Sequence, residues 1–235
     1  MIEFVALSDQ GRRITRERRV RLSDAGVDGL LRPDGLARYL QDIAVDDWDS
    51  TGVGAEDTWV VRRTSLRVVD GGHWPLLGDE VSLTTWCGGS GAAWAERRTN
   101  ISIDARLMIE VVALWVPVDP SGRPRRLRQS FFDVYGEAAA GRKVVGRVPT
   151  AALDLLATQR PWPIRRADLD VVGHVNNAAV WSALTELALG TLQRASLTHL
   201  GPLESTNTVT LASDANRLWL VVDGVVRVAG DFTLA

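Results

Sequence analysis

The chain has 235 residues, of which 46% are hydrophobic and 24% are charged, and its formal net charge is −2. These values are ordinary for a globular protein. They exclude a disordered or fibrous chain, and they provide no general attraction to nucleic acid or to membranes. The longest apolar stretch, residues 111–118, is too short to cross a bilayer, and the N-terminus is not the basic start of a secretory signal. We therefore expect a cytoplasmic protein without stable membrane insertion.

Candidate metal ligands and cofactor motifs are scarce. Cys87 is the single cysteine, and His73, His174 and His199 share no spacing typical of a zinc site. The chain contains no phosphate-binding loop and no dinucleotide fingerprint. We expect neither a metal nor a cofactor.

The first half of the chain is predicted to be one helix followed by strands. An extended segment before residue 20 leads through a loop with Asp and Gly into an amphipathic helix, whose apolar face comprises Leu36, Tyr39, Leu40 and Ile43. Alternating sequence at 59–69, 79–87, 92–103 and 107–118 predicts strands, and the GGSG at 88–91 and the DPSG at 119–122 predict turns.

Residues 119–160 are polar and rich in small residues and proline, which predicts a linker. A second helix is expected to follow, with an apolar face of Val180, Leu184, Leu187, Ala188 and Thr191 or Leu192. Strands are predicted at 207–213, 217–222 and 225–234, and Asp223-Gly224 predicts a hairpin between the last two. The second half is shorter and is predicted to lack the equivalent of one long strand pair.

The two halves share a weak internal repeat. Residues 20–42 align without gaps on residues 164–186, at an offset of 144, and each copy passes through a loop into a helix. We infer an α+β fold built from two copies of one unit, with two antiparallel sheets joined side by side and a central helix in each half. The expected domains are 1–130, a linker at 131–160, and a shortened domain at 161–235.

Residues 168–177, DLDVVGHVNN, hold the candidate chemistry. Asp170 lies four residues before His174, so a tight loop could bring a carboxylate and an imidazole into one site. Backbone N–H groups near Gly173 and Val175 would bind an anionic oxygen if they projected from a helix start. The alternative is structural, because Asn176 and Asn177 could simply cap the following helix.

This segment resembles the hotdog-fold thioesterase signature, and the chain is similar more specifically to the acyl-ACP thioesterases, which are double-hotdog proteins. The first-half stretches TWVVRRTSLRVV, GDEVSLTTW, ERRTNISI and ALWVPVDPSGRPRRL carry that likeness, which covers residues 14–228. The resemblance implies hydrolysis of a fatty acyl thioester, carried on acyl carrier protein (ACP) or on CoA, to a free fatty acid. It also implies a monomer containing an internal pseudo-dimer, or a homodimer.

The resemblance implies roles for individual residues. Asp170 and His174 are the implied catalytic pair, and the implied substrate-binding residues are Gly173, Val175, Asn176 and Asn177. The first copy has Gly26 and Leu30 at the positions of the pair. Only the second half could then carry the pair, while the first half supplies the acyl pocket.

Three positions depart from the family pattern. Val172 replaces an Asn that plant members carry two residues before the His, and Pro202 and Leu203 stand where they carry a Glu-Cys pair. Glu204 and His199 are nearby. These departures keep a second hypothesis open, a non-catalytic protein that binds fatty acids or fatty acyl thioesters.

Arginine clusters between residues 12 and 21 and between 123 and 128 admit two interpretations. They are either solvated surface or a docking site for an acidic carrier.

Overall fold

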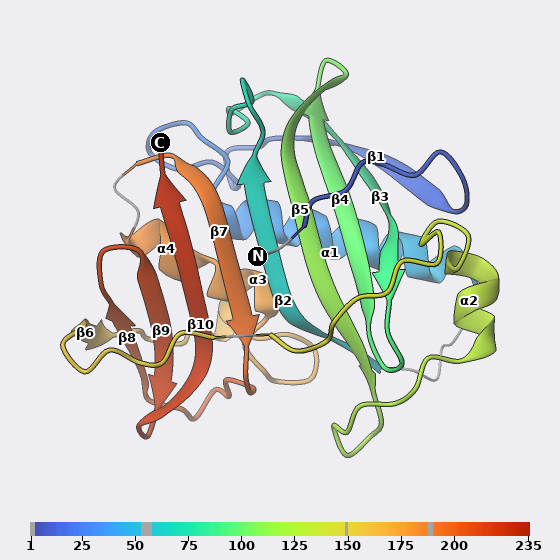
Figure 1. The fold of residues 1–235 in the computed structure, drawn as a ribbon. Helices are drawn as coiled ribbons and strands as arrows, with labels where there is room; N and C mark the ends of the chain where they lie inside the picture. The colour runs from blue at the N-terminus through green and yellow to red at the C-terminus, as the bar shows by residue number, and fades with distance from the viewer. Residues whose placement is uncertain (1–2, 53–57, 149, 188–189) are drawn as a thin grey trace.

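The computed structural model describes residues 3–52, 58–148, 150–187 and 190–235, which form one antiparallel sheet of ten strands in the order β1-β3-β4-β5-β2-β7-β10-β9-β8-β6 (Figure 1). The strands are β1 (Arg13–Arg19), β2 (Thr58–Val68), β3 (Glu80–Ser90), β4 (Ala95–Ile103), β5 (Arg106–Val118), β6 (Thr158–Pro161), β7 (Leu192–His199), β8 (Val209–Ser213), β9 (Arg217–Val222) and β10 (Val225–Leu234). The helices are α1 (Pro33–Asp49), α2 (Gln129–Tyr135), α3 (Asn177–Val180) and α4 (Ser182–Leu187).

The sheet confirms the duplication. Outward from the centre, the first half runs β2-β5-β4-β3-β1 and the second runs β7-β10-β9-β8-β6, which is the same topology. The halves join where β2 pairs with β7, and the hydroxyl oxygens of Ser65 and Ser196 lie 2.8 Å apart across that seam. The prediction that the second half lacks a strand pair was wrong, because all five strands are present and each is shorter than its counterpart.

The loops before the two helices also repeat their hydrogen bonds at the offset of 144. The Gly26 N–H donates to the Leu30 carbonyl over 2.8 Å, and the Asp170 N–H donates to the His174 carbonyl over 2.8 Å. Two further pairs of bonds match. The Arg21 N–H donates to Asp24 Oδ2 as the Arg165 N–H donates to Asp168 Oδ2. The Arg32 N–H donates to the Asp24 carbonyl as the Asn176 N–H donates to the Asp168 carbonyl. Both copies of the loop therefore adopt one backbone conformation.

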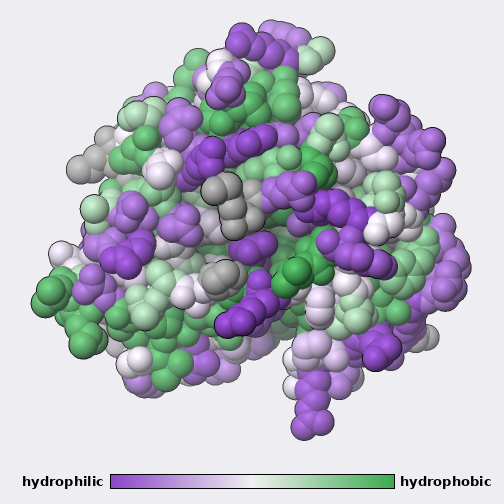
Figure 2. Space-filling view, in the orientation of Figure 1, coloured by the Kyte–Doolittle hydropathy of each residue, from purple (hydrophilic) through white to green (hydrophobic). Residues whose placement is uncertain are grey.

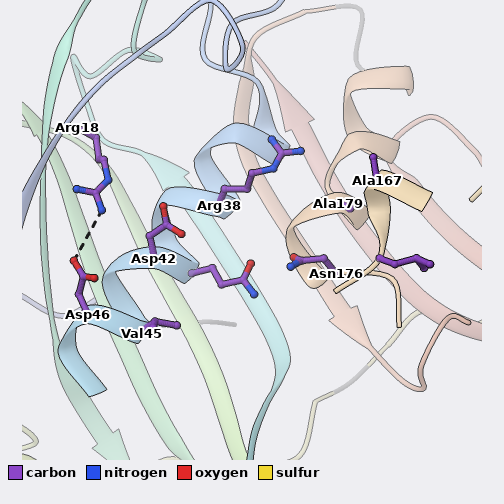
Figure 3. A pocket seen from close by; sticks show the side chains of 10 residues that line it. Arg18, Arg38, Asp42, Val45, Asp46, Ala167, Asn176 and Ala179 are labelled. Atoms are coloured by element: carbon purple, nitrogen blue, oxygen red, sulfur yellow. Dashed lines mark ion pairs between the residues drawn. The ribbon is translucent and has the colours of Figure 1, made fainter. Parts of the chain in front are cut away.

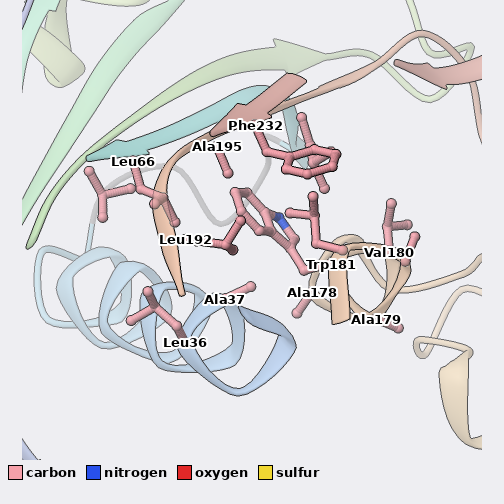
Figure 4. Packing of buried hydrophobic residues seen from close by; sticks show 14 of the residues in the cluster. Leu36, Ala37, Leu66, Ala178, Ala179, Val180, Trp181, Leu192, Ala195 and Phe232 are labelled. Atoms are coloured by element: carbon pink, nitrogen blue, oxygen red, sulfur yellow. The ribbon is translucent and has the colours of Figure 1, made fainter. Parts of the chain in front are cut away.

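The helices α1, α3 and α4 cover one face of the sheet, and the segment that connects the halves passes along its edge as α2 and then crosses the other face (Figure 1). Pro33 begins α1, where a missing N–H is harmless, and Leu36, Tyr39 and Ile43 are buried as predicted. Leu36 and Leu66 lie in the core together with Trp181 and the other residues drawn in Figure 4.

The predicted second helix is interrupted and short. Trp181 ends α3, α4 ends at Leu187, and Leu192 already belongs to β7. The predicted position Ala188 lies outside the described residues. Leu192, the first residue of β7, is apolar and buried in the core. Its position also fits the spacing of the helix face, so the predicted helix extended too far.

The predicted linker contains secondary structure and packs at both ends. Phe131 and Tyr135 on α2 pack against Cys87 on β3, and Leu153 and Ala157 pack against a cluster that includes Trp219 on β9. β6 pairs with β8. Hydrophilic and hydrophobic side chains are mixed over the face that this segment crosses (Figure 2).

Two turn predictions had different outcomes. At 88–91 the expected turn was wrong, because β3 continues through Ser90. The Asp223-Gly224 hairpin is confirmed: it joins β9 to β10, and both residues have a positive φ, as a two-residue turn of this type requires. No described helix has the length and apolarity needed to span a membrane.

Candidate active site

The loop from Asp170 to His174 is held together by the Asp170 carboxylate. Its Oδ1 accepts hydrogen bonds from the N–H groups of Val172 and His174, at 3.0 and 3.1 Å. Asp170 is half-buried, whereas Val171 and Val172 point into solvent at the tip of the loop. The carboxylate therefore contacts the His174 backbone and shapes the loop.

The backbone amides expected to bind a substrate oxygen already have partners. The Gly173 N–H donates to the Asp170 carbonyl at 3.1 Å, and the Val175 N–H donates to the Leu203 carbonyl at 2.8 Å. The Asn176 N–H donates to the Asp168 carbonyl at 2.8 Å. The expectation that Gly173 and Val175 present free amides is wrong, because the backbone bonds of this repeated loop use them.

His174 is exposed and lies opposite Glu204. The two residues form an isolated antiparallel bridge, which places their side chains on the same face of the local ribbon as neighbours. Of the family positions that depart here, Pro202 is exposed and Leu203 is buried. Glu204, to which the sequence assigned no role, is thus the carboxylate beside the histidine.

Asn176 caps α3, as the structural alternative predicted. Its Oδ1 accepts from the Ala178 N–H at 2.8 Å, while its Nδ2 group forms no hydrogen bond with any described residue. Asn177 is the first residue of α3 and is half-buried. The cap fixes the side chain of Asn176 and directs its amide toward α1 (Figure 3).

A polar cavity of about 510 Å³ separates α1 from this segment (Figure 3). Asn176 lines it from the second half together with Leu169, and Arg38 and Asp42 line the opposite wall. Desolvation raises the pKa of Asp42 despite the nearby Arg18. Asp170 and His174 are not among its lining residues, so these side chains lie beside the cavity rather than in its wall.

A second cavity, of about 310 Å³, continues along α1 and is largely aromatic. It shares Gln41 and Val45 with the polar cavity. Its aromatic lining comprises Trp48, Trp59, Trp115, Phe131 and Tyr135. The rings of Trp48, Trp59, Phe131 and Tyr135 contact one another, and Trp48 and Tyr135 are stacked with centroids 6.4 Å apart. Volumes of this size are typical of small-molecule sites.

Three further ionisable residues, Asp168, His199 and Cys87, are buried parts of the fold and have no role in the proposed chemistry. Burial alone would raise the pKa of Asp168, but hydrogen bonds from Arg165 outweigh it and hold that pKa below its ordinary value. Burial lowers the pKa of His199 to about 4, so this histidine is neutral inside the fold, and its Nε2 has no hydrogen-bond partner among the described residues. Burial also raises the pKa of the Cys87 thiol, which makes it a poor nucleophile.

Comparison with known families decides the assignment of the chain. Residues 11–135 match the model of the acyl-ACP thioesterase N-terminal domain. The chain belongs to the acyl-ACP thioesterase family. An uncharacterized protein of Mycobacterium tuberculosis, Rv2001, is 27% identical over 211 residues, which cover 85% of this chain and 83% of the relative.

Solved structures described as thioesterases share the fold over nearly the whole chain. The 12:0-ACP thioesterase from Umbellularia californica superposes with a TM-score of 0.78 at 17% identity, over 96% of this chain and 98% of that one. A Lactobacillus plantarum protein, provisionally described as an oleoyl thioesterase, gives a TM-score of 0.82 at 17% identity, over 98% and 100% of the two chains. The predicted double hotdog fold is confirmed.

Proposed function

We propose that the protein is a cytoplasmic thioesterase that hydrolyses fatty acyl-ACP to a free fatty acid and the carrier thiol. The observation that carries the proposal is the continuity of the two cavities along α1, which share Gln41 and Val45. A carrier-bound acyl group has a polar pantetheine arm and an apolar chain. The polar cavity fits the arm, and the aromatic cavity fits the chain.

In this proposal Asp170 and His174 perform the chemistry at the edge of the polar cavity. Asp170 Oδ1 is used by the loop, which leaves Oδ2 to accept a proton from water. The water oxygen attacks the thioester carbonyl carbon, the carbon–sulfur bond breaks, and the departing thiolate takes a proton from His174. The proton that Asp170 took from water then passes to His174, which restores both residues. Glu204, opposite His174, orients the imidazole.

We assign carrier docking to the arginines between 123 and 128. Much of the first arginine cluster is occupied, because Arg12 pairs with Asp47 at 2.7 Å and Arg16 with Asp46 at 3.0 Å. Arg123 and Arg126, by contrast, are exposed on the segment between β5 and α2. Exposed guanidinium groups attract an acidic protein surface. Because ACP is an acidic protein, we expect acyl-ACP to be preferred over acyl-CoA.

A non-catalytic acyl-binding protein is the second candidate. One observation favours it: the side chains of Asp170 and His174 do not line the polar cavity. Such a protein would retain the two cavities and hold a fatty acid or an acyl thioester without turning it over. Native mass spectrometry of the purified protein would then detect a bound lipid that is released only on unfolding.

The deciding experiment is a hydrolysis panel of saturated acyl chains on ACP and on CoA, with thiol release as the readout. We expect turnover of acyl-ACP, and we expect Arg123→Glu with Arg126→Glu to raise KM for acyl-ACP but not for acyl-CoA. The matched control is Arg13→Glu with Arg19→Glu, two exposed positions on β1. Absence of hydrolysis on every substrate would refute the enzyme and leave the acyl-binding candidate.

A further inference from the structure

We propose that Gln41, in the first half of the chain, binds the thioester carbonyl oxygen together with the Asn176 amide of the second half. This inference rests on the proposed thioesterase function and adds a catalytic residue to it. It also changes the division of labour expected from the sequence, in which the first half supplied only the acyl pocket. The oxyanion donors would then come from two side chains on opposite walls of one cavity.

The first step of the argument is the state of the backbone amides. Those of Gly173, His174, Val175 and Asn176 all donate to acceptors within the protein. A developing oxyanion needs donors that are free before the reaction begins. Next to the polar cavity, the Nδ2 group of Asn176 meets that need, because the helix cap uses only Oδ1.

The second step is the position of Gln41. The thioester is the point at which the substrate changes from a polar arm to an apolar chain, so its carbonyl must lie where the polar cavity meets the aromatic one. Gln41 and Val45 are the two residues that line both cavities. Of these two, Gln41 alone carries a hydrogen-bond donor, and its amide forms no hydrogen bond with the residues that the structure describes.

The third step concerns charge in the polar cavity. Arg18 lies 3.9 Å from the Asp46 carboxylate, and Arg38 pairs with Asp34 at 2.8 Å. Asp42 adds a further carboxylate to the same wall. The cations are therefore matched by anions, and an oxyanion formed here depends on neutral donors such as the two amides.

The kinetic test compares isosteric variants of Gln41 in the full chain. Gln41→Glu and Gln41→Met remove the donor at nearly constant volume, and each is expected to lower kcat about a hundredfold with little change in KM. Gln159→Met, an exposed position on β6, is the matched control and is expected to leave kcat unchanged. Asn176→Asp keeps the helix cap while removing the donor, and its effect is expected to be non-additive with that of Gln41→Met.

A second readout does not depend on turnover. An acyl-pantetheine amide, in which nitrogen replaces the thioester sulfur, is labelled with ¹³C at the carbonyl, and its stretching frequency is measured in the bound state by infrared spectroscopy. Wild type is expected to lower this frequency relative to water, and Gln41→Met to reverse part of that shift. If Gln41→Met binds the amide with the same carbonyl frequency as wild type, the role of Gln41 is refuted and the acyl site is not. If wild type does not bind the amide, both the role of Gln41 and the acyl site are refuted. Failure of hydrolysis with a Gln41-dependent frequency refutes only the thioesterase.

Discussion

Asp170 has two separable tasks, and two substitutions distinguish them. Its Oδ1 accepts two backbone N–H groups that close the loop, while its Oδ2 is proposed to act as the base. Asp170→Asn keeps a carbonyl oxygen at Oδ1 and so preserves the loop, but an amide cannot take a proton from water. Asp170→Ala removes both the loop acceptor and the base.

The expected magnitudes follow from these contacts. Each partly solvated hydrogen bond contributes about 0.5–1.5 kcal/mol, so loss of both in Asp170→Ala should lower the free energy of unfolding by about 1–3 kcal/mol. In a chain of this size that corresponds to a fall in Tm of about 2–12 °C. Asp170→Asn should leave Tm nearly unchanged and lower kcat about 10²–10⁴-fold, which is the usual contribution of a general base.

The assay pairs thiol release from acyl-ACP with thermal unfolding of the same preparations. Asp28→Asn is the matched control, because Asp28 Oδ1 accepts the Leu30 N–H in the equivalent loop of the first half. That variant should retain wild-type kcat. Wild-type turnover by Asp170→Asn would refute the base assignment, and it would leave Asp170 as a residue that only shapes its loop.

Three further predictions concern the interior. Burial, and then the charge of Arg62, lowers the pKa of His199 from 6.5 to about 4. As the pH falls, the unfolded chain therefore binds a proton at this histidine before the folded chain does, and the free energy of unfolding of wild type should fall by up to about 3 kcal/mol between pH 6.5 and 4. Urea unfolding should show that His199→Leu abolishes this loss. Trp115→Leu enlarges the aromatic cavity and should move the maximum of kcat/KM toward longer acyl chains, whereas an unchanged maximum would exclude that cavity as the chain pocket. Arg98 approaches the buried Glu96 carboxylate to 2.6 Å, and Arg98→Met leaves that carboxylate with Arg142 as its one ion-pair partner among the described residues. Calorimetry should show a loss of about 3 kcal/mol, which Glu96→Gln partly restores.

The sequence could predict the duplicated fold because its signals are local. Alternation of apolar residues marks strands, and an ungapped offset of 144 links two loops that prove to share their hydrogen bonds. The strand β7 was missed for the same reason. Leu192 continued a helical spacing, and pairing with β2 on one side and β10 on the other makes its segment a strand.

The site could be predicted only in part, because its parts come from distant segments. The signature located Asp170 and His174, but it could not show that Leu203, nearly thirty residues later, takes the Val175 amide. Nor could it place Glu204 opposite His174. Gln41 gave no signal, because a glutamine on a helix is ordinary until the packing of two halves puts it between two cavities.

The two copies of the loop close on a carboxylate at different positions. The N–H at the fifth loop position, of Leu30 in the first copy and of His174 in the second, donates to a carboxylate oxygen in both. The first copy supplies this acceptor from the third loop position, Asp28, and the second copy supplies it from the first position, Asp170. Because Asp170 already closes the second loop, no acceptor is required at its third position, where the side chain of Val172 is exposed.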